Sequence, residues 1–286
     1  MRRLVVLAAM VLGAPTASSA ALDYTGVRSL GMGQGLRGFA TGDAGLMLNP
    51  SGMSLLRAYT VEADYQLRAK NRAHVGHASI VDSTSGYNIG GGIYYTFAAA
   101  RPDGGPERSD HEAGLALSFP FGDRFFLGGT LKYLHLDDAA DSRGLTVDAG
   151  ITVRPLPAFT MGVAVYNLRD LDIPETQRGV GYGIAAIPAA DVLVVIDGVT
   201  HFAAPATGNK TRTSVMGGAE ALLAKRLGVR AGGGWDAWRE NGYMTAGLSA
   251  VSGDGAIDVS FRQDVTGSTN KETLVAVGLR LFVSVQ

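Results

Sequence analysis

The sequence predicts an all-β protein, a 14-stranded antiparallel transmembrane β-barrel. Three observations favour this fold class. Polar and apolar residues alternate with a period of two in successive segments of about ten residues, as they do in the strands of membrane barrels. The number of these segments is even. The links between them alternate between short and long, which is typical of bacterial outer-membrane barrels.

Composition narrows the class further. Charged residues make up 18% of the 286 residues and there are 40 glycines, whereas soluble domains have about 25% charged residues and about 7% glycine. A net charge of -1 provides no basic surface for nucleic acid. The chain has no cysteine, which excludes disulfides, cysteine-bound zinc, iron–sulfur clusters, thiol nucleophiles and a lipidated N-terminal cysteine. The fold is therefore held together by noncovalent contacts.

Residues 1–20 have the pattern of a secretory signal peptide. Arg2 and Arg3 form a positive start, Leu4–Ala14 is an apolar run, and Ser18–Ala20 provides small residues for cleavage. The alternative is a membrane anchor, but the run of eleven apolar residues is much shorter than the ~20 that a spanning helix needs. We therefore expect export, and any membrane span must be a β-strand.

The segment Arg143–Arg154 illustrates the alternation. One face carries Leu145, Val147, Ala149, Ile151 and Val153, and the other carries Thr146, Asp148, Gly150, Thr152 and Arg154. The same criterion predicts strands at 58–70, 73–82, 86–97, 110–119, 124–135, 143–154, 159–168, 177–187, 191–199, 212–222, 226–235, 241–251, 255–263 and 272–284.

The predicted links give the topology. Links after even-numbered strands are short, as in Pro120–Asp123, Pro155–Ala158 and Pro188–Ala190. Most links after odd-numbered strands are longer and polar, as in Ala98–Ser109 and Thr200–Thr211. Short turns lie on the periplasmic side of such barrels, so both termini are expected there.

The polar faces of the strands predict the barrel interior. They carry the lumen-facing residues Glu62, Asp64, Lys132, Asp148, Arg154, Glu220, Arg230, Asp258, Arg262 and Arg280. Mixed charges can pair and fill a narrow lumen, or they can line a polar conduit. A soluble β-sandwich would also alternate. Aromatic residues near strand ends, such as Tyr59 and Trp235, favour the membrane barrel instead, because they resemble interfacial girdles.

Residues 21–57 do not alternate, and residues 58–286 form the expected barrel. Within the N-terminal segment, Asp43 is expected to cap a short helical turn and Pro50 to end it at Asn49. The turn should point its Leu and Met side chains one way. The candidate gate residues are Asp43, Leu46, Leu48, Asn49, Pro50 and Gly52.

This segment resembles a known signature. Arg28–Gly33, followed by Asp43–Ala44 and Asn49–Gly52, resembles the N-terminal motif of FadL-type long-chain fatty acid transporters and of the related PorV-type outer-membrane proteins. Segments Leu131–Tyr133 and Val165–Leu168 are also similar to those of PorV-like chains. The resemblance implies a fourteen-stranded barrel whose N-terminal segment is a hatch inside the lumen. Ser51 stands where alanine is usual, and the outer loops are too short for the hydrophobic capture groove of fatty acid transporters.

The resemblance implies uptake of small, fatty-acid-like hydrophobic solutes past the hatch. The alternative is a non-enzymatic docking or assembly component of an envelope or secretion machine. Outer-membrane lipid, a hydrophobic small molecule and an envelope protein are the expected partners, and no nucleic acid is expected.

No enzyme activity, cofactor or metal is expected. Gly31–Gly35 lacks the βαβ unit of a phosphate-binding loop, and no Gly-x-Ser-x-Gly nucleophile motif is present. His74 and His77 are three residues apart on a predicted strand, so they point to opposite faces, and the histidines are interpreted as exposed or loop residues.

Overall fold

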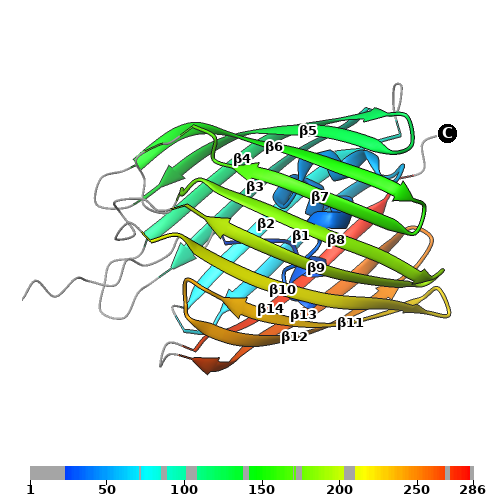
Figure 1. Cartoon of the computed structure of the whole chain (residues 1–286). Helices are drawn as coiled ribbons and strands as arrows, with labels where there is room; N and C mark the ends of the chain where they lie inside the picture. The colour runs from blue at the N-terminus through cyan, green and yellow to red at the C-terminus, as the bar shows by residue number, and fades with distance from the viewer. Residues whose placement is uncertain are drawn as a thin grey trace, which may run out of the picture.

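The chain forms a closed antiparallel barrel with its N-terminal segment inside (Figure 1). The computed structural model describes residues 23–70, 72–84, 89–100, 108–137, 142–169, 171, 176–202, 210–267 and 271–283. The predicted signal peptide lies outside the described residues. No helix in these ranges is long and apolar enough to cross a bilayer.

The barrel wall has fourteen strands, as predicted. They are β1 (Tyr59–Arg68), β2 (Ala73–Asp82), β3 (Gly90–Ala100), β4 (Arg108–Phe121), β5 (Phe125–Leu136), β6 (Ser142–Leu156), β7 (Phe159–Tyr166), β8 (Gly179–Ala189), β9 (Val192–His201), β10 (Arg212–Leu223), β11 (Leu227–Asp236), β12 (Asn241–Val251), β13 (Gly255–Gly267) and β14 (Thr273–Phe282). Each strand pairs with its neighbours in sequence, and β1 pairs with β14 to close the sheet. The alternative prediction of a soluble two-sheet β-sandwich is therefore wrong.

Several strands run further than predicted. Strands β3 and β4 extend into the loop expected at Ala98–Ser109, and β9 extends into the loop expected at Thr200–Thr211. Strands β4, β6 and β8 likewise run into the turns expected at 120–123, 155–158 and 188–190. Antiparallel pairing with the neighbouring strand continues past the alternating residues, which is why alternation alone placed these ends too early.

The wall has an apolar exterior and a polar interior. In β6, Leu145, Val147 and Ile151 are exposed, whereas the intervening Thr146 and Asp148 are buried. The predicted facing of this strand is therefore confirmed. Exposed apolar side chains of this kind recur on neighbouring strands, as expected for a surface in contact with lipid.

The N-terminal segment contains four short helices, which are α1 (Val27–Gly31), η1 (Arg37–Phe39), α2 (Asp43–Met47) and η2 (Pro50–Ser54). Asp43 is the first residue of α2 and not its cap. The cap position is Gly42, and no side chain bonds to the helix start there. Asn49 has the extended backbone that a following proline favours, and Pro50 begins η2.

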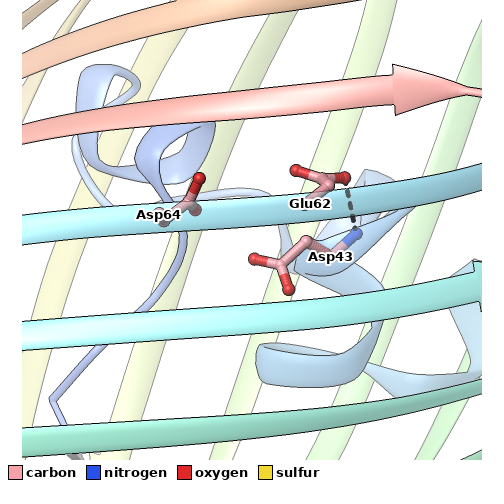
Figure 2. A group of neighbouring side chains, drawn as sticks. All are labelled: Asp43, Glu62 and Asp64. Atoms are coloured by element: carbon pink, nitrogen blue, oxygen red, sulfur yellow. Dashed lines mark hydrogen bonds between the residues drawn. The ribbon is translucent and has the colours of Figure 1, made fainter.

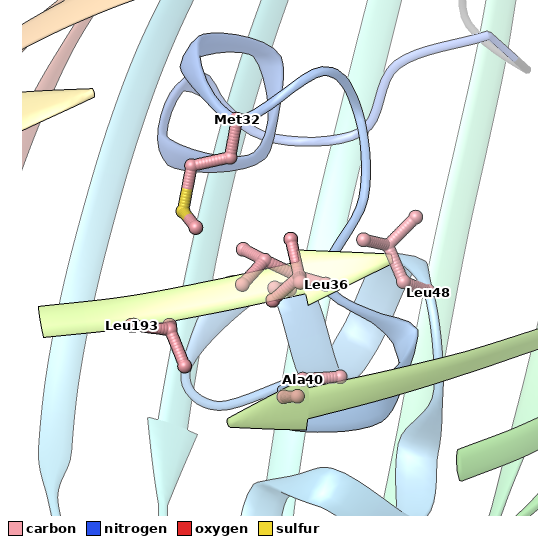
Figure 3. Packing of buried hydrophobic residues seen from close by; sticks show 8 residues of the cluster. Met32, Leu36, Ala40, Leu48 and Leu193 are labelled. Carbon is pink, nitrogen blue, oxygen red and sulfur yellow. The ribbon is translucent and has the colours of Figure 1, made fainter. Parts of the chain in front are cut away.

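Apolar residues of the segment pack against two parts of the wall. Met32, Leu36, Ala40 and Leu48 form a buried cluster with Leu193 of β9 (Figure 3). Leu46 and Met53 pack instead with residues of β2, β3 and β4. The prediction that the Leu and Met side chains of the turn point one way was wrong, because the lumen surrounds the segment and offers apolar contacts on opposite sides.

The membrane depth assigned to Val147, on the outward face of β6, can be tested. Val147→Arg places a charge at the middle of the lipid-facing surface and should destabilise the barrel by about 2–4 kcal/mol. Leu227→Arg places the same charge at the start of β11, near the membrane interface, where the destabilisation should be about 0–1 kcal/mol. The free energy of unfolding from lipid vesicles should fall for the first variant by the larger amount. An equal loss in both variants would contradict the placement of Val147 at the membrane centre.

Candidate functional site

The candidate site is the interface between the N-terminal segment and the inner wall of the barrel. Wall glycines bring the two backbones into direct contact. A Cβ on Gly128 would lie 2.4 Å from the carbonyl carbon of Pro50, one on Gly162 would lie 2.1 Å from the Arg37 carbonyl oxygen, and one on Gly218 would lie 2.6 Å from the Met32 carbonyl oxygen. Any larger residue would push the segment away from the wall.

Asn49 joins three parts of this interface. It is fully buried, and its Nδ2 donates to the Arg37 carbonyl oxygen at 3.0 Å and to Thr152 Oγ1 at 3.2 Å. Its Oδ1 accepts from the Ser51 amide at 3.3 Å and from Ser51 Oγ at 2.7 Å. Ser51 Oγ also lies 2.7 Å from Thr152 Oγ1. Ser51 therefore adds a hydrogen bond between the N-terminal segment and β6.

Two further candidate gate residues fix the local chain. Pro50 lies against Gly128, as described above, and a Cβ on Gly52 would lie 2.2 Å from the Ala40 carbonyl oxygen. Gly52 thus allows η2 to pack on the segment before α2. Leu46 and Leu48 belong to the two apolar clusters.

An ion pair that the sequence analysis missed holds η1. Asp197 Oδ2 accepts from the amides of Leu36 and Arg37 at 2.8 and 2.7 Å, and Arg37 Nη1 lies 3.3 Å from the same oxygen. Arg37 Nε also donates to Tyr166 Oη at 2.9 Å. The sequence feature that could have indicated this pair is Asp197 itself, because it is a single carboxylate on the inward side of the apolar run Val192–Val199.

Six charged residues form a continuous arc along the inner wall. In order they are Arg28, Glu220, Arg230, Asp258, Arg280 and Glu62. Successive members carry opposite charges, and the separations are 2.6, 2.6, 2.6, 2.9 and 3.9 Å. Arg28 belongs to α1, so the arc ties the segment to β10, β11, β13, β14 and β1. Paired and hydrogen-bonded charges of this kind are tolerated in a desolvated interior.

The other predicted lumen residues lie elsewhere. Lys132 Nζ pairs with Asp148 Oδ2 at 2.8 Å. Arg262 pairs with Asp236 and Asp264 and stacks over Tyr243, with its Cζ 3.8 Å from the ring centroid. Arg154 lies at the rim, where its Nε donates to the Asp123 carbonyl oxygen at 2.8 Å. The predicted polar residues are thus divided among separate networks.

Asp43 and Asp64 lie together near β2. Tyr24 Oη donates to Asp64 Oδ2, and burial together with Asp64 keeps the pKa of Tyr24 well above its usual value. His77 Nε2 lies 2.8 Å from Asp43 Oδ1. Burial opposes ionisation of Asp43, but His77 outweighs it, so the pKa of Asp43 lies below its usual value. The interpretation of the histidines as exposed or loop residues was wrong for His77, because its inward position on β2 buries it.

A cavity of about 250 Å³ lies between the segment and the wall, at the barrel end where the C-terminal strand finishes. Its apolar lining includes Met53, Leu56, Val81, Leu222, Val251, Ala256 and Phe282. Members of the charged arc, including Arg28, Glu220 and Arg280, line another part of it. The space is therefore amphipathic.

Solved structures share this architecture. The Ralstonia pickettii toluene transporter TbuX has a TM-score of 0.73 at 12% identity, covering 92% of this chain and 99% of that chain. The monoaromatic hydrocarbon channel CymD has a TM-score of 0.67 at 13% identity, covering 92% of this chain and 98% of that chain. The fold is that of a FadL-type barrel.

A third similar structure is the Pseudomonas putida toluene transporter TodX, with a TM-score of 0.67 at 10% identity, covering 89% of this chain and 96% of that chain. No protein-family model and no curated protein matches the sequence. The resemblance to FadL-type barrels is thus supported for the fold, and the resemblance to PorV-type proteins stays a prediction.

The glycine contacts give a matched pair of variants. Gly128→Val should displace η2, because the new side chain would overlap the Pro50 backbone, and should destabilise the segment by about 1–3 kcal/mol. Gly129→Val changes the adjacent residue, whose Cβ would meet only the Asp148 carbonyl oxygen at 3.6 Å. Limited proteolysis of the refolded barrel should cleave residues 23–57 faster in Gly128→Val alone. Equal protection in both would contradict the tight contact.

Proposed function

We propose that the protein takes up small hydrophobic solutes across the outer membrane, with residues 23–57 acting as the hatch. The observation that carries this proposal is the match of its fold, over 92% of the chain, to a toluene transporter. The apolar exterior of the barrel supports placement in the outer membrane. Residues 23–57 pack inside the lumen, which supports a route that opens only when they move.

The cavity beside the hatch supports a small solute. Its volume of about 250 Å³ exceeds the ~150 Å³ of an engineered apolar cavity that binds benzene. Leu222, Val251 and Phe282 line it, and apolar walls favour a solute with little polarity. Fatty acids are less well supported, because the outer links are short. We therefore propose solutes the size of a monoaromatic hydrocarbon.

Strand pairing also bears on the route. Every neighbouring pair of strands in the described ranges is hydrogen-bonded, and β1 closes on β14. A solute in the lumen therefore meets hydrogen-bonded strand pairs all round the described wall. We infer that passage requires movement of the hatch, and hence disruption of the charged arc at Arg28, its one member in the N-terminal segment.

Filling the cavity tests the route. Ala256 is buried and lines the cavity, whereas the adjacent Ile257 is exposed on the lipid side. Ala256→Trp should lower uptake of radiolabelled toluene by intact cells at least fivefold, and Ile257→Trp should leave it unchanged. Equal uptake in the two variants would show that solute does not pass the cavity. Wild-type uptake no higher than in cells lacking the protein would instead favour the docking role.

Removing the hatch tests its function. Deletion of Tyr24–Met53 behind an intact signal should raise single-channel conductance in planar bilayers, because the polar lumen of fourteen strands would then hold water. A deleted barrel that inserts and conducts no more than the full chain would mean that wall side chains close the lumen. That outcome would also favour docking over transport.

A further inference from the structure

Three carboxylates meet between the N-terminal segment and the wall (Figure 2). Asp43 begins α2, while Glu62 and Asp64 lie two residues apart on the inward face of β1. One oxygen from each can be chosen so that all three lie within 4.8 Å of one another. Residues from two separate parts of the chain thus present oxygens to one space.

The local charges do not balance. The charged arc contains three arginines and three carboxylates, so Glu62 is already matched there. Asp43 pairs with His77, which is charged only when protonated. Asp64 receives the hydroxyl of Tyr24, a neutral donor. Among the described residues, the cluster therefore carries excess negative charge in a desolvated space, which is costly unless a cation or proton compensates it.

A buried hydroxyl without a partner lies beside the same space. Among the described residues, neither Thr60 Oγ1 nor Asp43 Oδ2 of the cluster itself has a hydrogen-bond partner. Thr60 is 4% exposed, and its side chain points inward. Ser79, 3% exposed, is directly opposite Glu62 in the pairing of β1 with β2. Buried polar atoms are normally satisfied, so the unpartnered Thr60 hydroxyl beside three carboxylates indicates a missing ligand.

Two glycines of the N-terminal segment pack closely against the cluster. A Cβ on Gly26 would lie 2.8 Å from Asp43 Oδ2. A Cβ on Gly42 would lie 3.2 Å from Glu62 Oε1 and 3.9 Å from Thr60 Oγ1, so these two oxygens lie on the same side of Gly42. Both glycines have positive φ, which disfavours replacement by a residue with a side chain. Glycine at these positions therefore lets the segment approach the oxygens of the cluster closely.

We propose that Asp43, Glu62 and Asp64, assisted by the hydroxyls of Thr60 and Ser79, bind a hard divalent cation of the size of Ca²⁺. All these donors are oxygens, which hard cations prefer. The three oxygens lie within 4.8 Å of one another, so one ion at Ca²⁺ ligand distances of about 2.3–2.6 Å can contact all of them. Mg²⁺ usually keeps several waters and takes one or two carboxylates, so a site with three carboxylates favours Ca²⁺.

The site has an entry path and a structural consequence. Gly42, Thr60 and Glu62 also line the 250 Å³ cavity, so a hydrated ion can reach Glu62, one carboxylate of the cluster, from that end of the barrel. The bound ion would join α2 to β1, because Asp43 comes from one and Glu62 and Asp64 from the other. It would thus fasten the N-terminal segment to the first strand of the wall.

Binding can be measured on the refolded full-length barrel in detergent after treatment with a chelator. Tb³⁺, which replaces Ca²⁺ at oxygen sites, should show saturable Tyr-sensitised luminescence, because Tyr24 contacts Asp64. Ca²⁺ should displace Tb³⁺ at a concentration at least tenfold lower than Mg²⁺. Asp43→Asn and Asp64→Asn should each weaken Ca²⁺ binding at least tenfold. Thr60→Val should weaken it about threefold, and this change removes no hydrogen bond that the structure contains.

The matched control is Glu112→Gln, a buried carboxylate on β4 that accepts from Tyr94 outside the cluster. It should bind Ca²⁺ like the wild type, and heat-modifiable gel mobility shows that each variant is folded. Absence of saturable Tb³⁺ binding, or an equal loss in Glu112→Gln, overturns the site. Displacement by Mg²⁺ as readily as by Ca²⁺ overturns the assignment of ion size. Since no transport is measured, the result is independent of the proposed function.

Discussion

The structure depends on one constraint, that no backbone amide or carbonyl of the wall can remain unpaired in hydrocarbon. Pairing of β1 with β14 meets it by removing both edges of the sheet. Closure in turn fixes the period-two facing of every strand, because a one-residue slip would turn charged side chains toward lipid. A closed wall of this size then encloses a polar space, which must either be filled by protein or contain water.

The N-terminal segment fills much of that space by two different means. Glycines at Gly128, Gly162 and Gly218 let its backbone touch the backbone of the wall, so shape complementarity there requires no side chains. Elsewhere, alternating charges join Arg28 to the strands. Buried ion pairs contribute little net stability, but breaking one is costly. The segment is therefore held by contacts that specify one position more strongly than they stabilise it.

The sequence was sufficient for the wall and insufficient for the interior. Alternation placed all fourteen strands because lipid imposes the same requirement on each of them. It also put Asp148 and Asp258 on the inward face. Alternation could not predict which residues these carboxylates pair with, since the partners depend on the tilt of the barrel strands and on where the N-terminal segment lies. Arg37 with Asp197, and Asp43 with His77, are 160 and 34 residues apart, and no local pattern relates them.

The arrangement of the segment also bears on how the chain assembles. Ser260 Oγ donates to the Val27 carbonyl oxygen at 2.7 Å across 233 positions. Contacts this distant in sequence form slowly, because long loops must close first. Val27, which is synthesised before every strand of the wall, therefore finds its final partner on a strand made near the end. Folding of the lumen must be a late event, and until then the earliest residues need another environment for their apolar side chains.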